Sequence, residues 1–337
     1  MKKFVLVTGC SGFIGFHTVN KLLSNNHNVI GIDNINSEYD TDLKLQRLKL
    51  LKSHKKKHNF YFKKIDISYK SHFRKLFIKF NIQNVINLAA IAGVRESINN
   101  PRKYLDSNII GFLNLLELSN EFKVNKILYA STSSIYGDNN TYPSSEKLTP
   151  SPIQFYATTK VTNELMAQTW KSLYKMNLIG LRFFTVYGPF GRPDMAYYKF
   201  TKKILEGKKI DIYNKGKMYR DYTYIDDIVN GILQLINKAP SLNKKIKIKN
   251  DSLSPVAPYR VLNIGNTKKI YLLDFINSLE KQLNKKIKKN YLPMQKGDVH
   301  STLSDSSLLK KITGYNPKTN YKIGIKKFIN WYVNYYK

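Results

Sequence analysis

The stretch Lys3-Phe-Val-Leu-Val-Thr8-Gly9-Cys-Ser-Gly12-Phe-Ile-Gly15 decides the fold of this chain. Its first six residues predict a short buried strand, and the pattern from Phe16 to Leu23 predicts a helix. Glycines at this spacing permit a tight turn, close approach of backbone N–H groups to a diphosphate, and close packing of the helix on the strand. The partial positive charge at the helix N-terminus adds to the attraction for an anion.

A second apolar strand, Asn28 to Asp33, ends in a carboxylate 18 residues after Gly15. An acid near this position binds the adenosine ribose hydroxyls of a dinucleotide and repels a 2′-phosphate. We therefore expect NAD rather than NADP as the cofactor. The alternative for the glycine stretch alone is an ordinary glycine-rich turn. The basic stretch from Lys44 to Lys57 could hold a 2′-phosphate, but we interpret it as a solvated helix and loop.

Strands and helices continue to alternate after the second strand. We expect strands at residues 59–66, 84–89, 125–131 and 177–183, and helices at residues 70–80, 104–122 and 156–174. The alternation predicts an α/β fold of the Rossmann type, with a doubly wound parallel sheet that binds ligands at the carboxyl ends of its strands. We expect residues 1–188 to form the NAD-binding domain. Residues 189–337 are expected to form mainly a smaller C-terminal substrate lobe, with some segments returning to the first domain. A surface loop is expected at 238–258 and an amphipathic helix at 321–336.

The hydroxyl-rich segment Ala130-Ser131-Thr132-Ser133-Ser134-Ile135-Tyr136-Gly137 is followed by Tyr156-Ala-Thr-Thr-Lys160. Residues four apart on a helix share one face, so the ammonium of Lys160 is expected near the phenol of Tyr156. A nearby positive charge lowers the pKa of a tyrosine from about 10, which would make Tyr156 a usable base near neutral pH. Thr132 could hydrogen-bond the same substrate oxygen. Tyr-x-x-x-Lys alone would also suit an amphipathic surface helix, since the chain has 24 Tyr and is rich in Lys.

Together, these motifs resemble the extended short-chain dehydrogenase/reductase family of nucleotide-sugar epimerases, dehydratases and decarboxylases. The resemblance covers nearly the full length and is greatest to NAD-dependent UDP-glucuronate 4-epimerases. Further matching stretches are Asn87 to Pro101, Asn108 to Glu117, Leu181 to Ala196, Arg220 to Asp227, and Gln295 to Val299. Such enzymes usually have histidine at the position of Asn87, and we expect this difference to be structural rather than catalytic.

The resemblance implies a role for each of three groups of residues. Thr132, Tyr156 and Lys160 would be catalytic, with Tyr156 exchanging the proton of the sugar C4 hydroxyl. NAD would be bound by Gly9, Gly12, Phe13, Ile14, Gly15, Asp33, Asn34, Asp66, Ile67, Leu88, Ala89, Ala90, Asn108, Tyr156 and Lys160. The UDP-sugar would be bound by Arg95, Ser133, Ser134, Thr185, Arg192, Phe200, Tyr213, Arg220 and Asp298. No metal site is expected.

Within the substrate group, Arg220 is expected to bind the diphosphate, and Arg192 either a phosphate or the sugar carboxylate. Each could instead form an ordinary surface salt bridge. Tyr213, at the end of Ile212-Tyr213, is expected to face the uracil, although it could equally be a core aromatic. Asp298 would accept hydrogen bonds from the uridine ribose.

The residues after Thr132 distinguish the reaction types of the family. Related 4,6-dehydratases carry an adjacent Asp-Glu pair there and decarboxylases commonly a nearby Glu, whereas this chain has Ser133 and Ser134. The resemblance therefore implies epimerisation of UDP-glucuronate to UDP-galacturonate through a transient 4-keto sugar. The alternatives are decarboxylation of UDP-glucuronate, and 4-epimerisation of UDP-glucose or UDP-N-acetylglucosamine, for which the small Thr302 would leave room. A catalytically idle NAD-fold protein that binds partners is the non-enzymatic alternative.

Composition limits the remaining possibilities. The 337 residues, 42% of them hydrophobic, suffice for one large domain with an appended lobe. One cysteine, no signal-peptide pattern and no apolar run of membrane-spanning length lead us to expect a cytoplasmic protein without membrane insertion. The net charge of +33 attracts anions, but lysine is spread over the whole chain, so we expect no specific nucleic-acid partner. Because the family often forms dimers, the helices expected at 104–122 and 156–174 would give a homodimer through a four-helix interface.

Overall fold

The structure is a computed structural model, and it describes residues 2–139, 141–238, 251–253, 259–295 and 297–336. The surface loop predicted at 238–258 lies mostly outside these residues. The strands are β1 (Lys3–Thr8), β2 (Val29–Asp33), β3 (Phe60–Lys64), β4 (Asn81–Asn87), β5 (Lys126–Thr132), β6 (Leu178–Phe183), β7 (Thr185–Tyr187), β8 (Ile210–Ile212), β9 (Tyr219–Arg220), β10 (Tyr222–Tyr224), β11 (Arg260–Ile264), β12 (Ile270–Tyr271) and β13 (Lys289–Tyr291). The α-helices are α1 (Phe13–Ser24), α2 (Thr41–Lys52), α3 (Lys70–Lys79), α4 (Glu96–Asn99), α5 (Pro101–Tyr104), α6 (Gly111–Glu121), α7 (Phe155–Tyr174), α8 (Ala196–Leu205), α9 (Ile225–Lys238), α10 (Leu272–Leu283), α11 (Ser307–Thr313) and α12 (Tyr321–Tyr336).

Seven of the described strands form one parallel sheet in the order β11-β6-β5-β4-β1-β2-β3. The chain runs outward from β1 to β3, returns to β4 on the other side of β1, and then continues outward to β11. This is the doubly wound Rossmann-type sheet that the sequence predicts. The order reverses between β1 and β4, and ligands of such folds bind at the carboxyl ends of the strands at that point.

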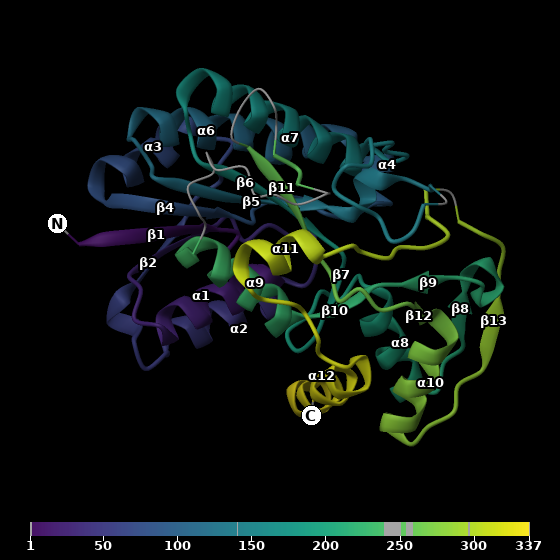
Figure 1. Ribbon diagram of the computed structural model, residues 1–337. Helices are drawn as coiled ribbons and strands as arrows, with labels where there is room; N and C mark the ends of the chain where they lie inside the picture. The colour runs from purple at the N-terminus through teal and green to yellow at the C-terminus, as the bar shows by residue number, and fades with distance from the viewer. Residues whose placement is uncertain (1, 140, 239–250, 254–258, 296, 337) are drawn as a thin grey trace.

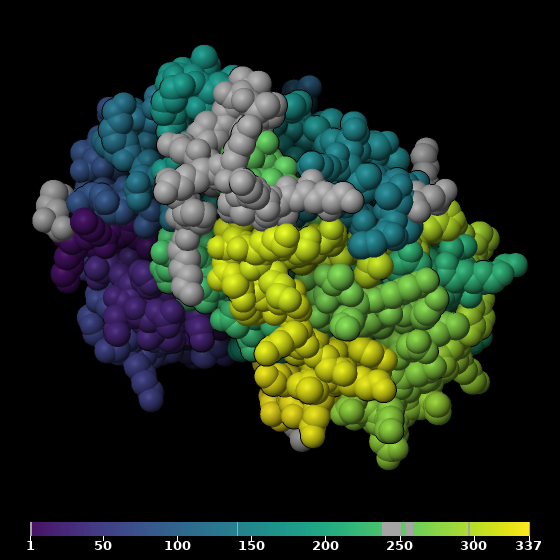
Figure 2. Space-filling model, in the orientation of Figure 1, coloured from purple at the N-terminus to yellow at the C-terminus, as the bar shows by residue number. Residues whose placement is uncertain are grey.

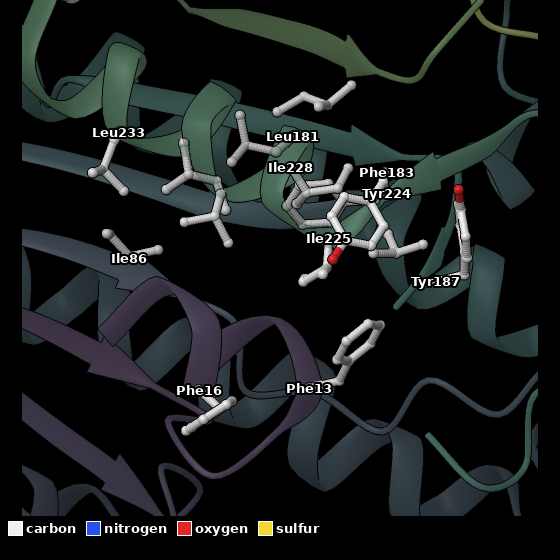
Figure 3. Close-up of a cluster of buried hydrophobic side chains, with 14 of the residues drawn as sticks. Phe13, Phe16, Ile86, Leu181, Phe183, Tyr187, Tyr224, Ile225, Ile228 and Leu233 are labelled. Carbon is white, nitrogen blue, oxygen red and sulfur yellow. The ribbon is translucent and has the colours of Figure 1, made fainter. Parts of the chain in front are cut away.

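Helices cover both faces of the sheet, with α3, α6 and α7 on one face and α1, α2 and α9 on the other (Figure 1). The helix α1 forms as predicted because its apolar residues recur at helical spacing, and Phe13, Phe16 and Val19 are buried. Figure 3 shows Phe13 and Phe16 on one side of the resulting cluster, with Ile225 and Ile228 of α9 on the other. Residues from the second half of the chain thus complete the core beneath the sheet.

The smaller lobe contains α8, α10 and the short strand pairs β8–β13 and β9–β12 (Figure 1). Its own core consists of Ile210, Ile212, Met218, Leu272 and Ile276. In the space-filling view the N-terminal residues, in purple, and much of the C-terminal part, in green and yellow, occupy opposite ends of the molecule (Figure 2). This is the C-terminal lobe that the sequence predicts.

The helix predicted at 104–122 is present, but it includes a π-helical segment, Leu105–Ile110, that joins α5 to α6 and that the sequence does not predict. The side chain of Asn108 within this segment donates to the Ile91 carbonyl at 3.0 Å and to the Thr159 hydroxyl at 3.1 Å. Its amide oxygen also accepts from the Ile91 backbone at 2.9 Å. The extra residue in the turn lets Asn108 satisfy the backbone of a neighbouring loop, as single-turn π-bulges do at functional sites.

Candidate active site

A cavity of about 1110 Å³ extends from the carboxyl ends of β1, β2, β4 and β5 into the smaller lobe. Every residue that the sequence assigned to the catalytic, cofactor or substrate group lines this cavity, except Asn108. Asn108 is buried among its partners Ile91 and Thr159. The fold therefore brings the predicted site residues together around one cavity, with the exception of Asn108.

The glycine loop has no room for side chains. A Cβ on Gly15 would lie 2.0 Å from the carbonyl oxygen of Gly9, and a Cβ on Gly9 would lie 2.8 Å from the backbone nitrogen of Ala89. Gly9 also has a φ of +67°, a conformation that favours glycine. The helix α1 has no side-chain N-cap at Gly12, and its first residues line the cavity. Backbone N–H groups at a helix N-terminus suit a diphosphate.

The acid predicted to bind the adenosine ribose is held in one orientation. Asp33 accepts hydrogen bonds from the backbone nitrogens of Ser11, at 3.0 Å, and Ile35, at 2.8 Å. On the neighbouring strand end, burial raises the pKa of the Asp66 carboxyl, but hydrogen bonds from Asn34 and Ser68 outweigh it and the pKa is lowered. A carboxylate beside the glycine loop and a second acid on the adenine side fit NAD.

Asn87, at the position where the family usually has histidine, is structural, as predicted. The hydroxyl of Thr8 donates to the Asn87 side chain at 2.6 Å. The same hydroxyl accepts from the backbone nitrogens of Leu88, at 3.1 Å, and Ala89, at 3.0 Å. The amide of Asn87 thus fixes the hydroxyl that ties the end of β1 to the cavity floor.

The three predicted catalytic residues meet at the end of β5. Thr132 is the last residue of β5, Tyr156 and Lys160 are one turn apart on α7, and all three are buried. The phenol of Tyr156 is hydrogen-bonded to Thr132. The ammonium of Lys160 donates to the Ala130 carbonyl at 3.0 Å. The arrangement can hold a sugar hydroxyl between a threonine and a tyrosine.

The predicted effect of Lys160 on Tyr156 is wrong in this structure. Burial raises the pKa of the Tyr156 phenol above its usual value, and the opposing effects come from the Thr132 hydrogen bond and the Arg192 charge. Burial also lowers the pKa of Lys160, to about 8, against the attraction of Glu164. Desolvation disfavours the charged form of both groups, and the helical spacing of the motif does not reveal that burial.

A buried ion pair lies behind the catalytic residues, and the sequence analysis did not identify it. Glu164, one turn beyond Lys160, pairs with Arg182 of β6 at 2.7 Å. Its other oxygen accepts from the hydroxyl of Ser131 at 2.6 Å. Arg182 also donates to the Tyr136 hydroxyl at 3.0 Å. The spacing of Glu164 from Lys160 on one helix face was the available signal.

At the substrate end of the cavity, Ser134 donates its backbone N–H to the Thr132 hydroxyl at 3.2 Å, and Ser133 lies beside it. Arg192 forms two hydrogen bonds with Asp194, at 3.0 and 2.6 Å, and both line the cavity. Arg192 therefore takes part in a salt bridge, the alternative left open by the sequence, while facing the cavity. Asp194 was not singled out from the sequence.

Farther into the lobe, Arg95 connects two other predicted substrate residues. Its guanidinium contacts Asp298 at 3.3 Å and lies 5.4 Å from the centre of the Tyr213 ring. Tyr213 thus lines the cavity rather than the core alone. Arg220 donates to the carbonyls of Val299, at 2.8 Å, and His300, at 2.9 Å, and no acid among the described residues forms a salt bridge with it. Thr185, Phe200 and Thr302 also line the cavity.

The prediction of a solvated helix and loop at 44–57 is wrong for one face of α2. Lys44 and Arg47 are buried, whereas the stretch after them is largely exposed. Lys44 donates to the Asn36 carbonyl at 2.7 Å, and both residues line the cavity with Tyr39. Lys44 and Arg47 share a face with Leu43, Leu48 and Leu51, a helical spacing that their charges conceal.

Two further features concern metals and membranes. Among the described residues, no group of three or more His, Cys, Asp and Glu side chains is arranged to hold a metal ion. The helices in the described ranges include none with the length and apolar character needed to cross a membrane.

Residues 6–328 match the family model described as GDP-mannose 4,6 dehydratase. The chain is 46% identical over 335 residues to Protein CapI of Staphylococcus aureus, covering 99% of each. It is 44% identical over 338 residues to UDP-glucuronate 4-epimerase 4 of Arabidopsis thaliana, covering 98% of this chain and 76% of the plant protein. The crystal structure of UDP-glucuronic acid 4-epimerase from Bacillus cereus, in complex with UDP-glucuronic acid and NAD, has 32% identity and a TM-score of 0.87, covering 99% of this chain and 100% of that one.

Proposed function

Since this chain belongs to the GDP-mannose 4,6-dehydratase-like group of the extended short-chain dehydrogenase/reductase family, we propose that it is an isomerase that catalyses the NAD-dependent C4 epimerisation of a UDP-sugar. The substrate is UDP-glucuronate and the product UDP-galacturonate. The observation that carries the proposal is that Thr132, Tyr156 and Lys160 line one cavity. The two residues after Thr132, Ser133 and Ser134, line it as well. The two positions directly after Thr132 are serines, so no carboxylate stands there to serve the dehydration for which the family model is named.

The residues of the chain divide the work of the reaction. When bound, NAD supplies reversible hydride acceptance at the sugar C4. Tyr156 takes the proton of the C4 hydroxyl, Thr132 orients that oxygen, and Tyr156 returns the proton after the 4-keto sugar has turned over in the cavity. Lys160, which lines the cavity, would hold the nicotinamide ribose of bound NAD and supply a positive charge there. Because the pKa of Tyr156 is raised by burial, the base depends on Thr132 and Arg192 to favour its ionised form.

Arg192 and the serines support a uronate as substrate. A carboxylate needs a cation or several donors, and Arg192, Ser133 and Ser134 line the same cavity as Thr185. On the uridine side we assign Arg220 to the diphosphate, Tyr213 to the uracil and Asp298 to the ribose hydroxyls. The glycine loop with Asp33 is assigned to NAD, and residues 1–188 to the NAD-binding domain.

We also propose that the protein is a homodimer, with a second copy of the chain covering one side of α7. Large apolar side chains are exposed there and on the adjacent π-helical segment, namely Leu105, Ile110, Leu165 and Leu173. Two such helical pairs would form a four-helix interface. Sedimentation of the wild type and of Leu165→Lys tests this, because the variant should be a monomer with its fold unchanged. The single cysteine supports a reducing compartment, the cytoplasm.

The function is tested by incubating the purified protein with UDP-glucuronate, UDP-glucose and UDP-N-acetylglucosamine separately and resolving the nucleotide sugars. UDP-glucuronate and UDP-galacturonate should interconvert without added reductant and without release of carbon dioxide. A UDP-pentose as main product would instead identify a decarboxylase. Preferred turnover of the N-acetylated sugar would instead identify a UDP-N-acetylglucosamine 4-epimerase, in which the small Thr302 of the cavity leaves room for the N-acetyl group.

A further inference from the structure

Arg47 is fully buried in the face of α2 that packs toward the glycine loop. Its guanidinium donates to the Ser11 carbonyl at 2.9 Å and to the Tyr39 hydroxyl at 2.7 Å. It also donates to the carbonyls of Phe190, at 2.6 Å, and Gly191, at 3.2 Å. All four acceptors are neutral, and no described carboxylate forms an ion pair with Arg47. The sequence offered no role for this residue.

The four acceptors belong to three segments that are distant in the chain. Ser11 is in the glycine loop, and its backbone nitrogen donates to Asp33, the predicted ribose ligand. Tyr39 is in the loop after β2 and lines the cavity. Phe190 and Gly191 immediately precede Arg192. One guanidinium therefore joins the floor of the cofactor end to the backbone that leads into the substrate end.

The segment before Arg192 needs support from outside itself. Phe190 has a φ of +55°, a left-handed conformation that persists in a bulky residue only where its surroundings enforce it. No side chain fits at Gly191, where a Cβ would lie 2.0 Å from the Tyr197 hydroxyl. Arg47 binds the carbonyl oxygens of both residues, so it holds the backbone in the conformation from which Arg192 projects.

Arg47 also fixes the ring beside Arg192. The guanidinium carbon of Arg192 is 5.9 Å from the centre of the Tyr39 ring, whose hydroxyl is bound by Arg47. The edge of the Arg192 guanidinium donates two hydrogen bonds to the carboxylate of Asp194. The position of Arg192 in the cavity is therefore set by Asp194, by Tyr39 and by the preceding backbone, and Arg47 binds the last two.

We propose that Arg47 is a positioning residue, which acts through Arg192 to set the recognition of the sugar carboxylate and connects it to the glycine loop. The inference rests on the proposed function for the identity of the anion. Lysine cannot replace this arginine, because the two terminal nitrogens of the guanidinium bind different acceptors and a single ammonium cannot reach all of them. Arg47 does not touch substrate or cofactor, since it does not line the cavity.

The first test measures position without a substrate. The chain has eight arginines, so their Nε–H signals can be resolved by NMR and that of Arg192 assigned by its loss in Arg192→Ala. In the NAD-loaded wild type the chemical shift of this signal should differ from that of Arg102, which is exposed. In Arg47→Lys the Arg192 signal should move toward the chemical shift of Arg102. In Tyr39→Phe, which keeps the ring and the fold, it should move in the same direction by a smaller amount. The control Arg74→Lys, in an exposed ion pair with Glu121, should leave it unchanged.

The second test measures binding to the same NAD-loaded proteins by calorimetry. Arg47→Lys should weaken UDP-glucuronate about 10-fold and UDP-glucose less than about 2-fold, as expected for a misplaced charged hydrogen-bond donor. In an Arg192→Ala background, Arg47→Lys should add less than about 2-fold, because its effect passes through Arg192.

Three results would overturn the proposal: an unmoved Arg192 signal in both Arg47→Lys and Tyr39→Phe, equal loss of both sugars, or an undiminished effect in the Arg192→Ala background. If Arg47→Lys does not fold, Tyr39→Phe decides by the same signal. Failure of the wild type to bind any UDP-sugar would contradict the proposed function, and the NMR measurement would still decide whether Arg47 positions Arg192.

Discussion

Replacing Glu164 with Gln should destabilise the protein by about 3–5 kcal/mol, the cost of leaving one partner of a buried ion pair unpaired. The side chains of Arg182 and Glu164 are only 4% and 9% exposed. Two hydrogen bonds join them, at 2.7 and 2.9 Å. An amide of the same shape removes the negative charge and turns an N–H group toward a donor. The remaining hydrogen-bond partners of Arg182 are then neutral, namely the Tyr136 hydroxyl and the backbone carbonyl of Glu146.

The assay is urea unfolding at pH 7, followed by circular dichroism. The matched control is Glu117→Gln, which breaks the exposed pair with Lys70 and should cost less than about 1 kcal/mol. The double variant Glu164→Leu with Arg182→Met removes both charges and should be less destabilised than Glu164→Gln. A loss below about 1 kcal/mol in Glu164→Gln would refute the reasoning, as would a double variant that is destabilised as much as Glu164→Gln or more.

Three further predictions concern the cavity. Tyr156→Phe should lower turnover of UDP-glucuronate by about 10²–10⁴-fold, measured by chromatography of the products, while the nucleotide content of the purified protein shows that NAD is retained. Normal turnover would exclude Tyr156 as the base. Gly15→Ala places a Cβ 2.0 Å from the Gly9 carbonyl, so calorimetry should show at least about 10-fold weaker NAD binding, and unchanged affinity would contradict the assigned diphosphate site. Burial lowers the pKa of Lys160 from 10.5 to about 8, so between these pH values the unfolded chain binds more protons than the folded chain. As the pH falls from 10.5 through 8, the wild type should therefore lose about 3 kcal/mol of stability relative to Lys160→Met. Urea unfolding of both proteins across this range tests the last point, and parallel curves would show that Lys160 is not desolvated.

The fold and most of the cavity could be predicted because they depend on local patterns. Glycine spacing, an acid at the end of a strand, and the i, i+4 relation of Tyr156 and Lys160 each have a geometric meaning within a few residues. The family motifs placed Arg95, Arg220 and Asp298 on one cavity without any information about their distances.

What could not be predicted depends on burial and on contacts between distant segments. Lys44 and Arg47 are charged residues on an amphipathic face, and nothing local distinguishes them from the exposed lysines around them. The pKa of Tyr156 was predicted in the wrong direction because one neighbouring charge was considered and desolvation was not. The π-helical turn at Asn108 likewise follows from a loop seventeen residues away in the chain, at Ile91.

The edge position of β11 has a consequence for the order of synthesis. Chains leave the ribosome from the N-terminus at about 5–20 residues per second, and the sheet through β6 is made long before β11. The strand that covers β6 begins at Arg260, about 77 residues after β6 ends at Phe183. For roughly 4–16 s the nascent chain therefore carries an uncovered parallel edge, which is a template for pairing with another chain. During that interval the net charge of +33, spread over the whole chain, favours repulsion between neighbouring nascent chains.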